Sequence, residues 1–125
     1  MSGRNVLGGE LVVCGTDPLT GWTRTGCCAF HPADLGQHVV CAVVTERFLR
    51  YTASQGNDLS TPRGGFRGLR PGDRWCLCAS RWQQAYVDGM APPVVLEACD
   101  ERALAIVALD VLREHAVAPD AAPEP

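Results

Sequence analysis

The chain of 125 residues contains no lysine, and arginine supplies all 11 of its basic side chains. This absence excludes a lysine nucleophile or a lysine Schiff base from any reaction that the protein carries out. Positive charge is also scarce overall, because 14 acidic residues leave a net charge of −3. A general nucleic-acid-binding domain carries a positive excess, so nucleic acid is not an expected partner.

Long hydrophobic runs are missing as well. The longest apolar stretch, residues 39–44, is far too short to cross a membrane. The first ten residues carry a single arginine and lack the apolar centre of a signal peptide. We therefore expect a soluble, cytoplasmic protein without a membrane partner, and nothing in the sequence indicates its oligomeric state.

The length and composition predict one globular domain. Hydrophobic residues make up 46% of the chain and charged residues 20%, which is ordinary for a protein that buries a core. A chain of this size does not need disulfides or a metal merely to fold. We assign residues 1–116 to a single domain, and the composition of residues 117–125 predicts a disordered tail.

Four segments have the composition of strands, and a fifth is ambiguous. The β-branched run at 38–45 is the clearest, and it should be central and buried on both faces. A second strand at 73–78 follows the Pro71-Gly72 turn, and shorter strands are predicted at 11–14 and 94–98. Residues 100–102 are either a hairpin turn before a strand at 103–107 or a helix cap, and we favour the hairpin.

Helices are predicted at 46–55, after a cap at Thr45, and at 80–88 and 109–116. Gly56 and Gly89 supply stop signals for the first two. Residues 15–37 and 57–72 are left as two long loops. The predicted fold is therefore α+β, with a small mixed or antiparallel sheet, two to three helices and two long loops.

Cysteine is the most informative residue type in this chain. A cytosolic protein keeps its thiols reduced, so a cluster of cysteines favours metal binding or thiol chemistry over disulfides. Seven is also an odd number, so complete pairing would leave one thiol over. The seven are Cys14, Cys27, Cys28, Cys41, Cys76, Cys78 and Cys99.

Two close pairs of cysteines predict a thiol-lined site. Cys76 and Cys78 are two apart on a predicted strand and share a face, whereas Cys27 and Cys28 lie in the first long loop. Neither pair has the Cys-x-x-Cys spacing of zinc sites. Two alternatives stay open: the pairs are buried small hydrophobes, or a disulfide joins loop and strand. Cys41, within its apolar strand, is expected to be a core residue.

The predicted metal ligands share thiolate chemistry, which favours zinc, with copper(I) or an iron–sulfur cluster less favoured. They are Cys14, Cys27, Cys28, Cys76 and Cys78. Without a metal, a thiolate acts as a nucleophile or redox centre, and His38 can serve as the base that activates it. The candidate catalytic residues are Cys27, Cys28 and His38. Strict alternation places His38 and Cys41 on opposite faces.

A polar stretch after the first helix, together with nearby arginines, is a candidate site for a small anionic ligand. The residues are Asn57, Asp58, Ser60, Thr61, Arg70 and Arg74. A solvated loop whose side chains hydrogen-bond within their own turns would explain the same residue types without a ligand.

Several segments carry a resemblance to a known family. They are NVLG at 5–8, TDP at 16–18, GCC at 26–28, GNDLSTP at 56–62 and GLRPGDRWCLC at 68–78. The chain resembles, over residues 4–116, the bacterial family catalogued as domain of unknown function 2237. The resemblance implies a single cytosolic bacterial domain and no mechanism. The chain differs from the family pattern in a short, arginine-rich loop at 63–67 and at Cys99, which makes Cys99 the expected odd thiol.

The sequence therefore leads to two hypotheses. The first is a cytosolic cysteine-rich protein with a metal-binding or reactive-thiol site. The second is a non-enzymatic binding or accessory domain that recognises a small anionic ligand or a partner protein and uses its cysteines structurally. The sequence does not decide whether the protein is an enzyme.

Overall fold

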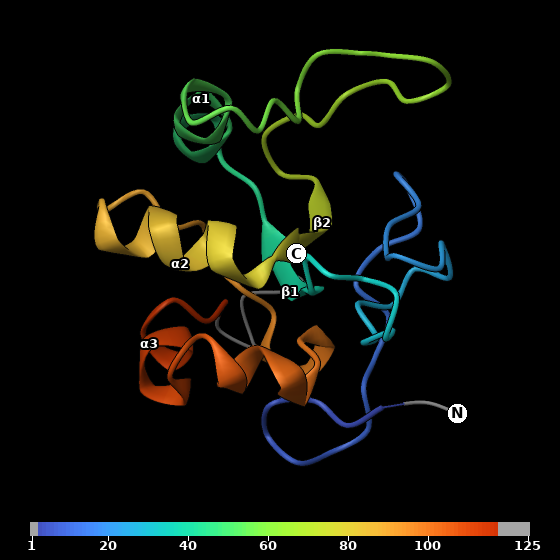
Figure 1. The fold of residues 1–125 in the computed structure, drawn as a ribbon, viewed down its shortest axis with the longest axis vertical. Coiled ribbons are helices and arrows are strands. Elements are labelled where there is room, and N and C mark those ends of the chain that lie inside the picture. Colours follow the sequence, from blue (N-terminus) through green and yellow to red (C-terminus); the bar gives the residue numbers. More distant parts are fainter. Residues whose placement is uncertain (1–2, 118–125) are drawn as a thin grey trace, which may run out of the picture.

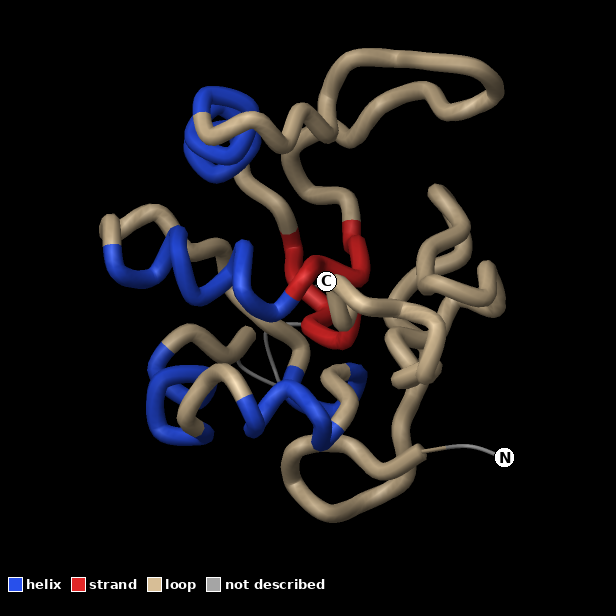
Figure 2. Tube along the Cα trace, in the orientation of Figure 1, coloured by secondary structure: helices blue, strands red, loops and turns tan. Residues whose placement is uncertain are grey.

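The computed structural model describes residues 3–117 and has the predicted α+β fold with a small sheet. In order, its elements are β1 (His38–Val43), α1 (Glu46–Ser54), β2 (Arg74–Cys78), α2 (Ala79–Val87), the 3-10 helices η1 (Leu96–Ala98) and η2 (Glu101–Ala105), and α3 (Leu109–Glu114). The three α-helices lie on one side of the two strands, and the N-terminal segment lies on the other (Figure 1). Loops make up most of the N-terminal side (Figure 2).

The two strands pair antiparallel, and a β-bulge interrupts their register. Cys41 lies opposite Cys76, but the register shifts between His38 and Val40, so that His38 lies opposite Cys78. Cys76 and Cys78 are two apart and share a face, and directly opposite residues also share a face. His38 and Cys41 therefore point to the same side of the sheet. The expectation from strict alternation was wrong, because the bulge adds one residue to β1.

The first two predicted helices are present within one residue of their expected bounds. The side chain of Thr45 caps α1 by accepting a hydrogen bond from the Phe48 N–H (3.1 Å), as the sequence predicted. Helix α2 follows β2 with no loop, so Cys78 is both the last strand residue and the helix N-cap. This direct junction holds the Cys78 side chain beside the first turn of α2.

The predicted strands other than β1 and β2 were wrong. Residues 11–14 form no regular element, and Val94 makes only isolated bridges. The predicted strand at 103–107 is instead mostly helix η2, because the Asp100 carboxylate accepts a hydrogen bond from the Arg102 N–H (2.9 Å). The helix-cap alternative for residues 100–102 is thus the one that the structure adopts.

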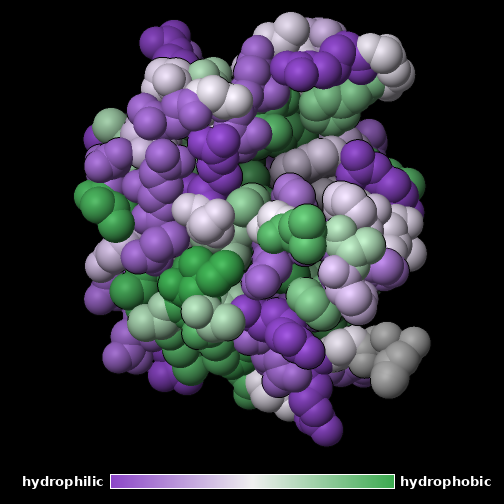
Figure 3. Space-filling model, viewed as in Figure 1, coloured by the Kyte–Doolittle hydropathy of each residue, from purple (hydrophilic) through white to green (hydrophobic). Residues whose placement is uncertain are grey.

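The core lies between the strands and the helices. Trp82 of α2 and Phe48 of α1 are fully buried within it, and the Trp82 indole donates a hydrogen bond to the Pro92 carbonyl (3.1 Å). On the face seen in Figure 3, hydrophilic residues cover α1, and hydrophobic residues gather near α3. Among the described residues, no helix is both long and apolar enough to cross a membrane.

The predicted tail, residues 117–125, lies outside the described residues except for Val117. The assignment of residues 1–116 to one domain stays a prediction.

Thr20 joins the N-terminal loop to β2 through a fully buried hydrogen bond, in which its Oγ1 accepts from the Cys76 N–H (2.9 Å). We expect Thr20→Val to lower the free energy of unfolding by about 1–3 kcal/mol, because it leaves a buried donor unsatisfied. Urea unfolding measures this change. Thr20→Ser is the control, since it keeps the hydroxyl and removes one methyl at a cost of about 1 kcal/mol. Equal losses in the two variants would contradict a role for the hydrogen bond.

Candidate thiol site

Two disulfides fasten the N-terminal loop to the strands. Cys14 is bonded to Cys41 of β1 (Cα–Cα 5.6 Å), and Cys28 is bonded to Cys76 of β2 (Cα–Cα 5.2 Å). Cys41 is buried, as expected of a core residue, but it also carries this bond. Of the alternatives that the sequence left open, a disulfide between loop and strand is the one the structure contains. The Sγ atoms of Cys14, Cys28 and Cys41 lie within 4.8 Å of one another.

The three remaining cysteines are free thiols in different surroundings. Cys99 is fully buried, and its Sγ accepts from the Cys41 N–H and donates to the Val95 carbonyl, both at 3.3 Å. Burial raises the pKa of the Cys99 thiol to about 12. Cys27 and Cys78 are partly exposed. Cys99 is therefore one of three unpaired thiols rather than the single odd one, and it is the least reactive of them.

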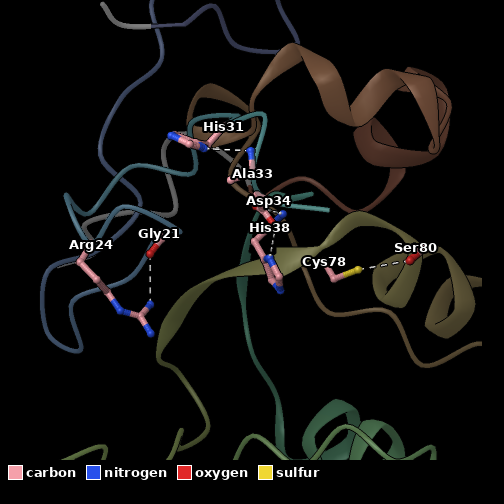
Figure 4. A network of polar contacts seen from close by, with 8 residues as sticks. All are labelled: Gly21, Arg24, His31, Ala33, Asp34, His38, Cys78 and Ser80. Carbon is pink, nitrogen blue, oxygen red and sulfur yellow. Dashed lines mark hydrogen bonds and ion pairs between the residues drawn. The ribbon is translucent and has the colours of Figure 1, made fainter. Parts of the chain in front are cut away.

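Cys78 faces His38 across the sheet. The hydrogen bond next to this pair joins their neighbours, from the Ala79 N–H to the Gln37 carbonyl (3.0 Å). His38 and Cys78 themselves are therefore a non-hydrogen-bonded pair, the type in which opposing residues are closest. The Cys78 Sγ also lies 3.2 Å from the Ser80 hydroxyl in the first turn of α2. In Figure 4 the Cys78 sulfur points toward Ser80, and the His38 ring lies on the other side of the Cys78 side chain.

A buried carboxylate orients His38. Asp34 is 1% exposed; its Oδ1 lies 2.7 Å from His38 Nδ1, and its Oδ2 accepts from the His38 N–H at 2.7 Å (Figure 4). With Nδ1–H donated to the carboxylate, His38 Nε2 is left as a proton acceptor. Asp34 was not among the predicted site residues, although it lies only four residues before His38, near the end of the loop that precedes β1. The turn that folds it back includes the hydrogen bond from Gln37 N–H to Asp34 O (3.1 Å).

Two adjoining hollows give access to this pair. The first, of about 280 Å³, is lined by residues that include Trp22, Arg24, His38 and Trp75. The second, of about 180 Å³, shares His38 and Trp75 with the first and adds Cys78 and Arg81. The Trp22 and His38 rings stack with centroids 6.2 Å apart, and the Arg24 guanidinium lies 5.4 Å from the centre of the Trp75 ring. Cys78 and His38 thus lie at a concave, aromatic surface.

The predicted anion-binding stretch is mainly bonded to itself. The Asp58 carboxylate accepts from the backbone N–H groups of Ser60 and Thr61 and from both of their hydroxyls. The hydrogen bond from the Thr61 hydroxyl is the main reason that the pKa of Asp58 is lowered. Asn57 lies elsewhere: it lines the second hollow, and its amide donates to Thr52 Oγ1 (3.1 Å).

The remaining predicted site residues are dispersed. Arg70 and Arg74 are exposed on either side of the turn that precedes β2. Cys27 and Cys28 are adjacent, yet Cys28 is buried and disulfide-bonded, whereas the Cys27 N–H donates to Thr25 Oγ1 (3.4 Å). Of the three candidate catalytic residues, His38 is the one that the structure brings to the free Cys78 thiol.

The model of one protein family, described as an uncharacterized protein conserved in bacteria, domain of unknown function 2237, matches residues 4–116. The chain belongs to this family. No curated protein matches it. The resemblance inferred from the sequence segments is confirmed over the same residues, and the family description supplies no reaction. The function must therefore be argued from the site.

Counting thiols tests the pairing. The folded, unreduced protein should show two rapidly reacting thiols, Cys27 and Cys78, and denaturation should add Cys99 as the third. Reduction before denaturation should give all seven. Titration with a chromogenic disulfide measures each number. Seven thiols in the denatured but unreduced protein would show that the two disulfides are absent.

Proposed function

We propose that this protein performs thiol chemistry with Cys78 as the nucleophile, His38 as the base and Asp34 as the residue that orients the base. The observation that carries the proposal is the position of Cys78 opposite His38, whose Nδ1 is held by the buried Asp34 carboxylate. A nucleophile beside a base that a third group orients is the arrangement that activates a cysteine.

The chemistry follows from this arrangement. His38 Nε2 takes the proton of the Cys78 thiol, and the resulting imidazolium is stabilised by the Asp34 carboxylate, 2.7 Å from Nδ1. The thiolate then attacks an electrophilic atom of a substrate in the adjoining hollow. The leaving group departs with the bonding electron pair and takes back the proton from His38.

The start of α2 supports the thiolate. Cys78 is the N-cap of this helix of nine residues, and its Sγ lies 3.2 Å from the Ser80 hydroxyl. The positive end of the helix dipole and a hydroxyl hydrogen bond both favour a negative charge on sulfur. In the described part of the chain, Cys27 neither caps a helix nor lies opposite a histidine in a strand pair, and its N–H donates to Thr25 Oγ1.

Alkylation rates test the proposal, with Cys27 as a matched control in the same molecule. At neutral pH, iodoacetamide should modify Cys78 at least about tenfold faster than Cys27, because general-base assistance contributes at least this much. Peptide mass spectrometry over time measures both rates. His38→Ala and Asp34→Asn should slow the reaction of Cys78 about tenfold or more and leave that of Cys27 unchanged.

Circular dichroism checks that both variants fold. Equal rates at Cys78 and Cys27 in the wild-type protein would contradict the proposal, and the non-enzymatic binding hypothesis would then be favoured. A loss of rate at both cysteines in Asp34→Asn would indicate a general structural effect instead.

A second candidate function is binding of a soft metal ion, and the convergence of Cys14, Cys28 and Cys41 favours it. Their sulfur atoms lie within 4.8 Å of one another. In a tetrahedral zinc–thiolate site the sulfur atoms are about 3.8 Å apart, since each lies about 2.3 Å from the metal. All three are disulfide-bonded, so this function requires their reduction to thiolates. Cys27 and Cys78, which the sequence also suggested as ligands, are not in this cluster.

Zinc analysis before and after reduction tests this second function. If it holds, protein that is reduced, loaded with zinc and desalted should retain about one zinc ion per chain, and oxidised protein should retain none. Cys41→Ser should abolish retention, whereas Cys27→Ser, the control, should keep it. Absence of retained zinc in the reduced protein, with the fold intact by circular dichroism, would eliminate the metal function.

A further inference from the structure

The two hollows that His38 lines each contain an arginine, although the whole protein carries a net charge of −3. Arg24 lines the first hollow and Arg81 the second, and no aspartate or glutamate of residues 3–117 is among the residues that line either one. A concave site with one sign of charge concentrates ligands of the opposite sign.

Both arginines have unused donors. Arg24 Nη1 donates to the Gly21 carbonyl (3.1 Å), and Arg81 Nη1 donates to the Gln55 carbonyl (3.0 Å). Within the described chain, the ion pairs of arginine involve Arg50, Arg63 and Arg67, and neither Arg24 nor Arg81 has an acidic partner. Because a guanidinium has five N–H donors and no acceptor, each arginine can still bind a carboxylate or phosphate group.

An exposed aromatic surface lies between these charges. The Trp22 side chain is 46% exposed and stacks on His38, and Trp75 lines both hollows. Large aromatic side chains at a concave surface bind the flat, apolar part of a ligand. The combined arrangement offers aromatic contact and one positive charge in each of the two hollows that His38 lines.

We propose that the substrate of Cys78 is a small anion, bearing a carboxylate or phosphate group that Arg24 or Arg81 binds and a flat apolar part that lies against Trp22 and Trp75. This inference rests on the proposed function and names its substrate class. The hollows, about 280 and 180 Å³, together have the size of a small-molecule site.

The charge limits where the anionic group binds. A third hollow, of about 540 Å³, shares Arg24 and Trp75 with the first and also contains Asp17 and Arg67. Arg67 is paired there with Asp73 (3.1 Å). The third hollow is therefore of mixed charge, and the anionic group binds in the first or the second hollow, where no acidic residue is among the lining residues of the described chain.

Two aromatic disulfides of different charge serve as probes: anionic dithiobis(nitrobenzoate) and uncharged dithiodipyridine. In either reaction the Cys78 thiolate attacks one sulfur of the probe. The S–S bond of the probe breaks, a bond between Cys78 and that sulfur forms, and the aromatic thiolate leaves with the electron pair. Absorbance of the leaving group measures the rate.

The experiment compares rate ratios in matched variants. Cys78 is measured in the Cys27→Ser variant, and Cys27 is measured in the Cys78→Ser variant. For each thiol, the rate with the anionic probe is divided by the rate with the uncharged probe. This ratio should be larger for Cys78 than for Cys27. Arg24→Gln or Arg81→Gln, added to Cys27→Ser, should lower the ratio about tenfold or more, the size of one charge-assisted hydrogen bond. Arg50→Gln is the control, since Arg50 pairs with Glu46 on the exposed side of α1. High salt should reduce the ratio as the arginine variants do.

The outcomes separate this inference from the proposed function. The anionic substrate would be overturned if the ratio of the anionic-probe rate to the uncharged-probe rate were the same at Cys78 and Cys27. It would also be overturned if this ratio did not change in either Arg24→Gln or Arg81→Gln. In both cases Cys78 would still react fast with the uncharged probe, so the proposed function would stand. Slow reaction of Cys78 with both probes, no faster than Cys27, would overturn the proposed function itself.

Discussion

The candidate site depends on the attachment of the N-terminal loop to one face of the strand pair. This loop has little regular structure of its own, and two disulfides, with sequence separations of 27 and 48, join it to β1 and β2. In the chain-entropy account, each cross-link of this length restricts the unfolded chain by about 3–4 kcal/mol. The Thr20 hydrogen bond to β2 adds a polar contact beside them. Without this attachment, Trp22 and Arg24 would have no fixed position relative to His38, and the first hollow would not exist.

The β-bulge in β1 is the second requirement. Without it, His38 would turn to the opposite face from Cys41, and it would no longer lie on the same face as Cys78. Asp34 holds His38 in this orientation, because one of its carboxylate oxygens binds the ring Nδ1 and the other binds the backbone N–H of His38. A bulge and a buried carboxylate together thus place an oriented histidine opposite a cysteine, the pair that we propose to be reactive.

The periodic elements could be predicted from the sequence, whereas the site could be predicted only in part. The apolar run of β1 and the Thr45 cap of α1 have local signals, and both were found. Hydrophobic runs of four or five residues, such as 94–98, carry no comparable signal, because hydrogen bonds from distant segments decide their conformation. The pairing of Cys14 with Cys41 could not be deduced, since spacing does not determine connectivity. Asp34 was missed because nothing in a loop sequence shows that a carboxylate will be buried.

The free cysteines show why residue type alone could not single out Cys78, the proposed nucleophile. Cys99 is enclosed in the core, where loss of water raises its thiol pKa to about 12 and keeps it protonated. Cys27 is partly exposed on the loop, with its neighbour Cys28 committed to a disulfide. Cys78 combines exposure with a helix terminus and an oriented imidazole. The same thiol group is therefore a core side chain at Cys99, a loop thiol at Cys27 and the proposed nucleophile at Cys78, according to what surrounds it. Of the three free cysteines, Cys78 is the one that lines a hollow together with His38 and Arg81, and this position is the reason for proposing it as the nucleophile.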